Sequence, residues 1–180
     1  MKSVLINLGL FKAAWAATVF GAAASIPVAG AIAVAIAVLV HLARTRDVRA
    51  EATLLGLAAI VGLTWETLLV ATGVLEYSSG NLVPGFAPYW IVAMWILFAT
   101  TLNVGMRWLR KNAMVAAVAG AIGGPASFLA GASAGAVTLS NPLTSLLVIG
   151  IGWAVLLPIL VRIATRFDGQ DLQQPLPASA

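Results

Sequence analysis

Residues 113–137 read AMVAAVAGAIGGPASFLAGASAGAV, an apolar run without a single charged side chain. A helix needs about 20 apolar residues to cross the hydrocarbon core of a bilayer, and this run is long enough. Small residues recur at every fourth position: Ala119, Gly123, Ser127, Gly131 and Gly135, with Gly120 and Gly124 in a parallel row. In membranes such rows let two helix backbones approach closely. We therefore predict a transmembrane helix packed tightly against a neighbour.

Pro125 lies inside this run, directly after Gly123 and Gly124. Proline cannot donate to the carbonyl of Ala121, so the sequence predicts that the helix is kinked or broken there. Two interpretations remain open. The kink either serves close packing alone, or its free carbonyls line a ligand cavity, where broken membrane helices are tolerated. The second interpretation makes Pro125 a candidate ligand-binding residue.

Five further apolar runs accompany this one. They cover about 4–25, 26–41, 52–75, 89–108 and 142–162, and Asn141 with Pro142 supplies a cap and a first-turn proline for the last. The sequence thus predicts an all-α fold, a polytopic bundle of six transmembrane helices. This domain covers residues 1–166, and the polar, proline-bearing residues 167–180 are expected to form a disordered cytoplasmic tail.

The basic residues gather at one side of the predicted bundle. They are Lys2, Arg44, Arg46, Arg49, Arg107, Arg110, Lys111, Arg162 and Arg166, whereas Lys12 alone lies within a span. The opposite side carries no Lys or Arg. Because cytoplasmic loops hold the excess of basic residues, we expect both termini in the cytoplasm and a multi-pass location in the bacterial inner membrane.

Composition excludes several classes of function. Charged residues make up only 9% of the chain, against about 25% in soluble domains. There is no cysteine and one histidine, His41, which excludes disulfides, iron–sulfur clusters and paired-histidine sites. We therefore expect no metal site and no cofactor. The basic clusters form no groove with interleaved aromatics, so nucleic acid is not an expected partner.

Lys12 and Glu66 are the charged residues inside the predicted spans. Glu66 lies near the middle of its span, with Gly62 one turn away on a face suited to helix contact. A charge at mid-bilayer costs about 2.5–3.5 kcal/mol, so the carboxyl must be neutral or have a partner. Lys12 is the obvious partner. The alternatives are a structural ion pair, a Lys12 that reaches to the interface beside a neutral Glu66, or a pair that binds ligand or couples protons.

Four tryptophans lie deep in the spans: Trp15, Trp65, Trp95 and Trp153. They either fill the core or form an aromatic wall around a flat or long apolar ligand. Thr100, Asn103 and Arg107 share one helix face, where Asn103 either bonds across helices or contacts ligand. No nucleophile, base and orienting residue occur together, and His41 is far in sequence from any acid of suitable depth. We assign no catalytic residue.

Several strings in the chain resemble those of a known family. They are Asn7, Phe11, Trp15 and Gly21-Ala22; Pro88-Tyr-Trp with Met94-Trp95 and Phe98–Asn103; Gly120–Pro125 with Ala130-Gly131 and Gly135-Ala136; and Trp153 with Pro158. Together they resemble the bacterial inner-membrane family termed domain of unknown function 2878, over nearly the whole chain. Members of that family are often encoded beside enzymes that modify unsaturated fatty-acyl chains. The resemblance implies a lipid context and no particular activity.

Three functions fit these observations. The leading hypothesis is a non-redox binding or accessory protein that holds an apolar or lipid-derived small molecule between its helices. The candidate ligand-binding residues are Lys12, Trp15, Trp65, Glu66, Trp95, Thr100, Asn103 and Pro125. The second is a small-molecule transporter or the substrate-capture subunit of a vitamin-type importer. The third is a membrane enzyme acting on acyl chains, alone or with a membrane or soluble partner protein, with Glu66 as its acid or base.

Overall fold

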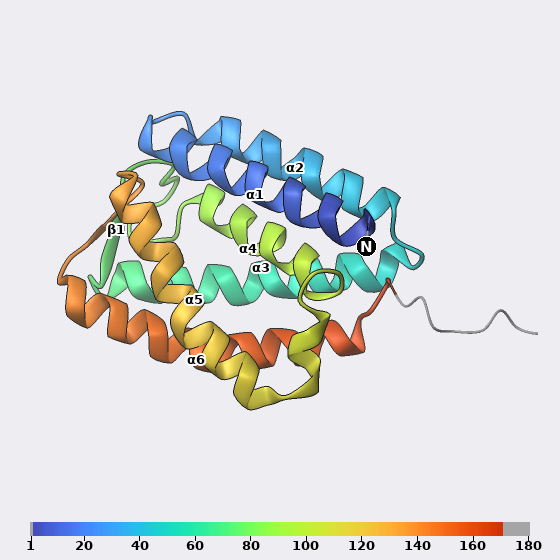
Figure 1. The fold of residues 1–180 in the computed structure, drawn as a ribbon. Coiled ribbons are helices and arrows are strands. Elements are labelled where there is room, and N and C mark those ends of the chain that lie inside the picture. The colour runs from blue at the N-terminus through green and yellow to red at the C-terminus, as the bar shows by residue number, and fades with distance from the viewer. Residues whose placement is uncertain (1, 171–180) are drawn as a thin grey trace, which may run out of the picture.

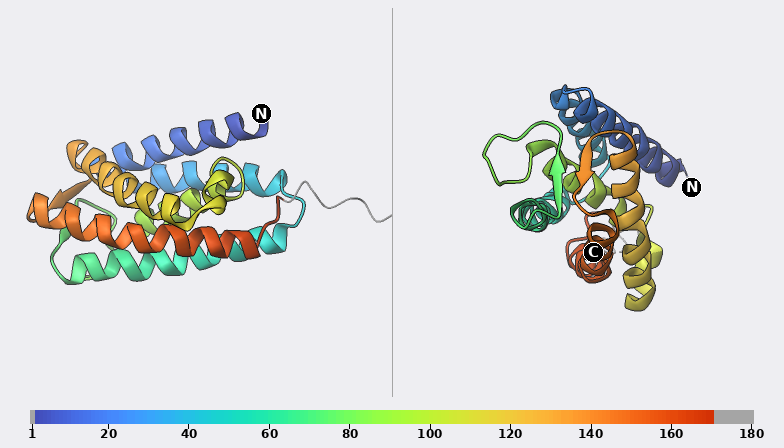
Figure 2. Two further views of the ribbon diagram at one scale, coloured as in Figure 1. Left: turned by 60° about the horizontal axis from the view of Figure 1, so that its bottom comes forward. Right: turned by 90° about the vertical axis from the view of Figure 1, so that its left-hand side faces the viewer.

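The computed structural model describes residues 2–170, and within them the chain forms six α-helices, one short 3₁₀ helix and two short strands. The helices are α1 (Lys2–Ala23), α2 (Pro27–Ala43), α3 (Val48–Ala71), α4 (Tyr89–Leu102), α5 (Ala113–Ser133) and α6 (Pro142–Arg166). The 3₁₀ helix η1 (Arg107–Lys111) follows α4, and the strands β1 (Leu75–Tyr77) and β2 (Val137–Leu139) follow α3 and α5. The all-α fold with six helices is confirmed. The pair α1 and α2 lies along one side of the bundle, α5 and α6 lie along the other, and α4 runs between them (Figures 1 and 2).

Four helices of the described chain are long and apolar enough to cross a membrane, namely α1, α3, α5 and α6. The other two, α2 with 17 residues and α4 with 14, are shorter but also apolar. Large apolar side chains stand on the outer faces: Ile36, Ile60, Ile122 and Ile151 are each more than half exposed. Exposed apolar surface of this extent is typical of a protein solvated by lipid. These features indicate a multi-pass membrane protein.

The starts of the helices follow local chemistry. The carboxylate of Asp47 accepts hydrogen bonds from the backbone N–H groups of Arg49 and Ala50, at 3.0 and 3.1 Å, and so caps α3. The side chain of Asn141 caps α6, and Pro142 occupies its first turn. The predicted start of this helix is therefore confirmed.

Helix α4 ends at Leu102, earlier than the predicted Trp108. The hydroxyls of Thr100 and Thr101 each donate to a carbonyl three residues back, at 2.7 Å, which competes with the helical ladder. The backbone N–H of Met106 then bonds to the carbonyl of Thr101 at 2.9 Å and closes a turn. The chain reaches α5 through η1 instead of a longer α4.

Helix α5 is continuous through Pro125, so the predicted break is wrong. A Cβ added at Gly150 of α6 would lie 3.3 Å from both the Pro125 ring and the carbonyl oxygen of Ala121. The carbonyl that Pro125 leaves without a donor therefore faces α6 across a close contact. The helix ends at Ser133, short of the predicted Val137, because Gly135 adopts the left-handed conformation, with φ of +85°, that terminates helices.

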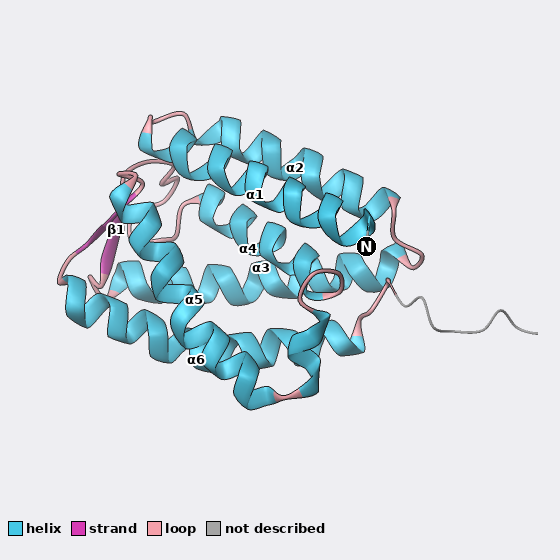
Figure 3. Cartoon of the chain, in the orientation of Figure 1, coloured by secondary structure: helices cyan, strands magenta, loops and turns pink. Residues whose placement is uncertain are grey.

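The two strands form a small antiparallel sheet at the end of the bundle opposite the basic clusters (Figure 3). Tyr77 pairs with Val137, and Leu75 pairs with Leu139. Sequence analysis assigned Val137 to a helix and Tyr77 to a loop, because strands of three residues are too short to show a period of two. The pairing turns the chain after α3 back across the bundle and carries Tyr77 toward α3.

Residues 167–170 pack against the turn between α2 and α3, although sequence analysis placed them in the tail. The backbone N–H groups of Arg46 and Asp47 donate to the carbonyl oxygen of Gly169 at 3.0 and 3.1 Å. The rest of the predicted tail, residues 171–180, lies outside the described residues.

Candidate functional site

An apolar cleft of about 370 Å³ separates α1 from α5. One wall comes from α1 with Phe11, Lys12 and Trp15, and the opposite wall from α5 with Ala119, Gly120, Gly123, Gly124 and Ser127. Phe98 of α4 and Trp153 and Leu157 of α6 also line it, and Met106, Trp108 and Leu109 lie near its basic end. The cleft is therefore lined by the N-terminal helix α1 and by α4, α5 and α6 from the later part of the chain.

The cleft tapers away from its basic end. A cavity of about 70 Å³ follows it along α1 and shares Phe11, Trp15, Phe98, Ser127 and Trp153 with it. A third cavity of about 30 Å³ shares Trp15 and Ser127 and reaches Tyr77 and the end of α5. Helix α5 lies obliquely in the bundle (Figure 1). The tapering shape of the space suits a long guest that is bulkier at one end.

Two glycines of α5 leave the space that Trp153 occupies in the wall of the cleft. A Cβ at Gly124 would lie 2.4 Å from the Trp153 ring, and one at Gly120 would lie 2.1 Å from the Trp153 carbonyl oxygen. The ring stacks on Trp95 at a centroid distance of 4.8 Å. The predicted close packing of the small-residue rows is confirmed for these two glycines. Gly123 differs, because the position of its added Cβ has no neighbour within 4 Å and lies in open space.

Lys12 lies in the wall of this cleft and is exposed. Among residues 2–170 no carboxylate lies within ion-pair distance of its ammonium group. The predicted pair with Glu66 is therefore wrong. Lys12 lies halfway along α1, among aromatic and small side chains, as a cation that faces space a guest can enter.

Glu66 is fully buried and bonds to two other side chains instead. The Tyr77 hydroxyl donates to its Oε2 at 2.6 Å, and Trp95 Nε1 donates to its Oε1 at 2.8 Å. It lies near the end of α3 rather than at the middle of the span, because α3 begins at Val48 and ends at Ala71. Both oxygens are engaged, so Glu66 acts on the cleft through Trp95 and Tyr77.

Tyr77 lies beyond the end of α3, in β1. Burial raises the pKa of its hydroxyl well above the usual range, and the neighbouring Glu66 carboxyl raises it further. The hydroxyl therefore stays protonated at neutral pH and remains a donor to Glu66. Sequence analysis missed Tyr77 because nothing in the chain signals that β1 folds back onto α3.

Trp65 does not line the cleft or the two smaller cavities beside it, whereas Trp15 lines all three and Trp95 lines the cavity of about 70 Å³. A Cβ at Gly152 of α6 would lie 2.2 Å from its ring, which places Trp65 between α3 and α6. Trp95 occupies the equivalent place against Gly62, where an added Cβ would lie 2.2 Å from the ring. Of the three tryptophans proposed as a ligand wall, Trp15 and Trp95 line the tapering space.

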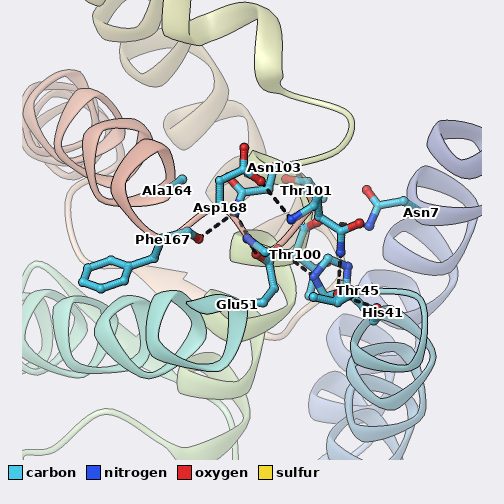
Figure 4. A network of polar contacts seen from close by, with 12 residues as sticks. Asn7, His41, Thr45, Glu51, Thr100, Thr101, Asn103, Ala164, Phe167 and Asp168 are labelled. Carbon is cyan, nitrogen blue, oxygen red and sulfur yellow. Dashed lines mark hydrogen bonds and ion pairs between the residues drawn. The ribbon is translucent and has the colours of Figure 1, made fainter. Parts of the chain in front are cut away.

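A second polar cluster lies at the basic end and centres on Glu51, which is completely buried (Figure 4). Its Oε1 lies 2.9 Å from His41 Nε2. Its Oε2 accepts from Asn103 Nδ2 at 2.8 Å and from the backbone N–H of Gly169 at 3.1 Å. The expectation that His41 has no nearby acid is therefore wrong. Its partner was missed because the sequence places Glu51 in a charged loop, whereas α3 begins three residues before it.

Asn103 joins this cluster to two ion pairs. Its Oδ1 accepts from Arg110, and Asp168 bonds to both Arg110 and Arg107, at 2.8 and 2.7 Å. Asn103 thus bonds across helices, which was one of its two interpretations. Thr100 lies beside the cluster, where its carbonyl oxygen accepts from Asn7 Nδ2 at 3.1 Å. Within residues 2–170 no three His, Asp or Glu side chains group to hold a metal ion.

The chain matches one known protein family over most of its length. A family model described as "Protein of unknown function (DUF2878)" matches residues 4–159. The chain belongs to the DUF2878 family. The resemblance found in the sequence is thereby confirmed. No curated protein and no solved structure matches the chain.

Proposed function

We propose that this DUF2878 protein is a non-redox binding protein that holds an apolar small molecule, lipid-derived in chemistry, in the cleft between α1 and α5. In this proposal all six helices cross the bacterial inner membrane with the basic end in the cytoplasm. The apolar outer faces support the membrane setting, and the gathering of the basic residues at one end supports the orientation.

The cleft is the observation that carries the proposal. A volume of about 370 Å³ lies within the range of small-molecule sites, which are mostly apolar with a few placed polar groups. Its walls match that description, because aromatic rings and glycines surround a single ammonium group. Trp15 and Trp153 offer flat surface, and Gly123 leaves open space at the α5 wall.

Lys12 gives the guest its orientation in this proposal. An ammonium group without a protein partner costs free energy inside the hydrocarbon region, and a ligand acceptor would offset that cost. In this proposal the Lys12 ammonium group donates a hydrogen bond to a carboxylate, phosphate or carbonyl oxygen of the guest at the wide part of the cleft. The apolar chain of the guest continues toward Tyr77. Glu66 contributes by holding Trp95 and Tyr77 in the wall.

Two glycine variants test the proposal. Gly123 and Gly56 are both exposed helical glycines whose added Cβ has no neighbour within 4 Å, but only Gly123 lines the cleft. A leucine at position 123 therefore fills the cleft without displacing protein atoms, and one at position 56 of α3 adds the same bulk elsewhere. Both proteins, together with the wild type, are purified in mild detergent and analysed by native mass spectrometry and solvent extraction.

We expect a defined small molecule in the wild type and in Gly56→Leu, and a loss of about tenfold or more in Gly123→Leu. Equal thermal unfolding of the two variants serves as the folding control. Recovery of bulk phospholipid alone from all three proteins would contradict the proposal. The proposal would also be contradicted if the wild type copurified with a helix-bearing protein in place of a small molecule, and Gly123→Leu released that protein.

A further inference from the structure

A second depression lies at the basic end, and it shares Leu109 with the cleft. It is open and shallow, with a volume of about 660 Å³, and it lies between the start of α5, η1 and the last turns of α6. Its apolar lining includes Ala113, Ala116 and Pro158, and its cationic lining consists of Arg110, Arg162 and Arg166. Nothing in the proposed function uses these residues.

Two of the three cations of this depression have no ionic partner in the described part of the chain. Arg162 and Arg166 are exposed on α6, and among residues 2–170 neither forms an ion pair. The one acid nearby, Asp168, already bonds to Arg107 and Arg110. Arg110 keeps a buried Nε that has no hydrogen-bond partner in the structure. The depression therefore presents a net positive field with donors to spare.

Along α6 an apolar residue is followed by two cations toward the basic end, and in a lipid the acyl chains are followed by the charged headgroup toward the membrane surface. Pro158, Arg162 and Arg166 lie at four-residue spacing, so they share one face of the helix. The apolar member lies deeper in the bundle, and the two cations lie in the last two turns at its basic end. Basic pockets between transmembrane helices on this side of a membrane are suited to anionic lipid headgroups.

We infer that this depression binds an anionic phospholipid of the surrounding bilayer, with its phosphate at Arg162 and Arg166 and its acyl chains along Pro158 and the start of α5. Guanidinium groups suit this role because they bond phosphate oxygens in a bidentate manner. The cation at the helix end also interacts favourably with the helix dipole, but that effect needs only Arg166 and leaves Arg162 unexplained.

The test compares two charge-neutralised proteins. Arg162→Gln/Arg166→Gln removes the two cations of the depression, and Arg46→Gln/Arg49→Gln removes two exposed cations from the turn between α2 and α3 at the same end. Each protein is equilibrated in mixed micelles that contain phosphatidylglycerol and phosphatidylcholine in equal amounts. Native mass spectrometry then counts the lipids of each kind that stay bound.

We expect the wild type and Arg46→Gln/Arg49→Gln to retain phosphatidylglycerol preferentially, and Arg162→Gln/Arg166→Gln to lose about tenfold of that preference. An equal loss in both double variants would overturn the inference, because it would show a diffuse effect of surface charge. Absence of any preference in the wild type would overturn it as well, and would leave an acidic protein segment as the occupant to examine. Gly123→Leu should retain phosphatidylglycerol normally, which separates this site from the cleft.

Discussion

Glu66 accepts two hydrogen bonds, and each of them fixes a side chain that lines the cavities beside α1. Trp95 is held through its indole N–H, and Tyr77 through its hydroxyl. At the scale of single residues, the charge inside the bundle thus shapes an apolar surface. Its removal should be felt in the packing of Trp95 against Trp153 as well as in stability.

A double-mutant cycle tests this arrangement. We expect Tyr77→Phe and Glu66→Gln each to lower the free energy of unfolding by about 1–3 kcal/mol, because the first removes the donor to Oε2 and the second replaces an acceptor oxygen by an amide NH2 group. The two losses should be coupled by about 0.5 kcal/mol or more, since the residues share a bond. Unfolding in detergent by graded denaturant measures all four proteins.

Lys12 supplies the matched control for that cycle. Lys12→Met combined with Glu66→Gln should give losses that add within about 0.3–0.5 kcal/mol, because the two residues are not in contact. Clear coupling between them would contradict the structure and restore a direct pair.

Lys12→Met should also lower the amount of retained small molecule by about tenfold without a large change in unfolding. The expected reason is the loss of the charge that meets the polar group of the guest, and a charge-assisted bond of this kind contributes about 1.5–3 kcal/mol. Lys12→Arg keeps the charge and should retain more ligand than Lys12→Met. Undiminished retention in Lys12→Met would remove this residue from the site.

The sequence predicted part of this residue-scale arrangement. The inward direction of Glu66 followed from the small residue at Gly62, which the structure places against Trp95. The partners of Glu66 did not follow. Tyr77 reaches it only because β1 pairs with β2, a contact between residues some sixty positions apart, and no local pattern encodes such a contact.

At the scale of elements, the glycines of α5 differ in how closely α6 packs against them. Gly120 contacts the backbone of α6, whereas Gly123 faces open space. The spacing of small residues predicted a packed helix and could not tell which glycines pack. It also predicted a kink or a break at Pro125, and the structure shows that the helix is not broken there and that α6 packs close to the freed carbonyl.

Two alanine substitutions distinguish these glycines. Gly120→Ala should destabilise the protein by about 1–3 kcal/mol, because its methyl group would lie 2.1 Å from the Trp153 carbonyl oxygen and the backbone cannot yield cheaply. Gly123→Ala should be neutral or stabilising by up to about 1 kcal/mol, because alanine favours the helix and meets no neighbour. Thermal unfolding in detergent measures both, and equal effects would contradict the packing of α5 on α6.

At the scale of the whole molecule, the basic end is closed by buried polar bonds rather than by apolar packing. Glu51 joins α2, α4 and the segment after α6 through His41, Asn103 and Gly169. The order and number of helices were predicted from apolar runs and basic clusters. The closure was not, because its residues come from four separate places in the chain, and Glu51 and Gly169 lie outside the predicted spans.

Removal of the Glu51 carboxylate should strongly lower the free energy of unfolding. Glu51→Ala leaves His41, Asn103 and the Gly169 N–H without their acceptor, so we expect a loss of about 3–5 kcal/mol in the free energy of unfolding. Asp47→Ala removes another acid from the same turn, at the cap of α3, and should cost about 1 kcal/mol. Comparable losses in the two variants would contradict the central place of Glu51.

The membrane layout is also tested at this scale, and the absence of native cysteine makes the test simple. Leu82→Cys lies in the exposed loop between β1 and α4, and Ser3→Cys lies at the basic end. In intact spheroplasts a membrane-impermeant maleimide should label Leu82→Cys and leave Ser3→Cys unlabelled until the cells are lysed. The reverse pattern would invert the proposed orientation.

An experimental density map of the protein reconstituted in a lipid nanodisc would show whether the cleft holds a guest. We expect elongated density in the cleft between Trp15 and Trp153, with one end beside the Lys12 ammonium group and no connection to the protein chain. A cleft that is closed by α1 packing onto α5, or that is filled only by the same disordered lipid that surrounds the outer faces, would contradict the proposed function.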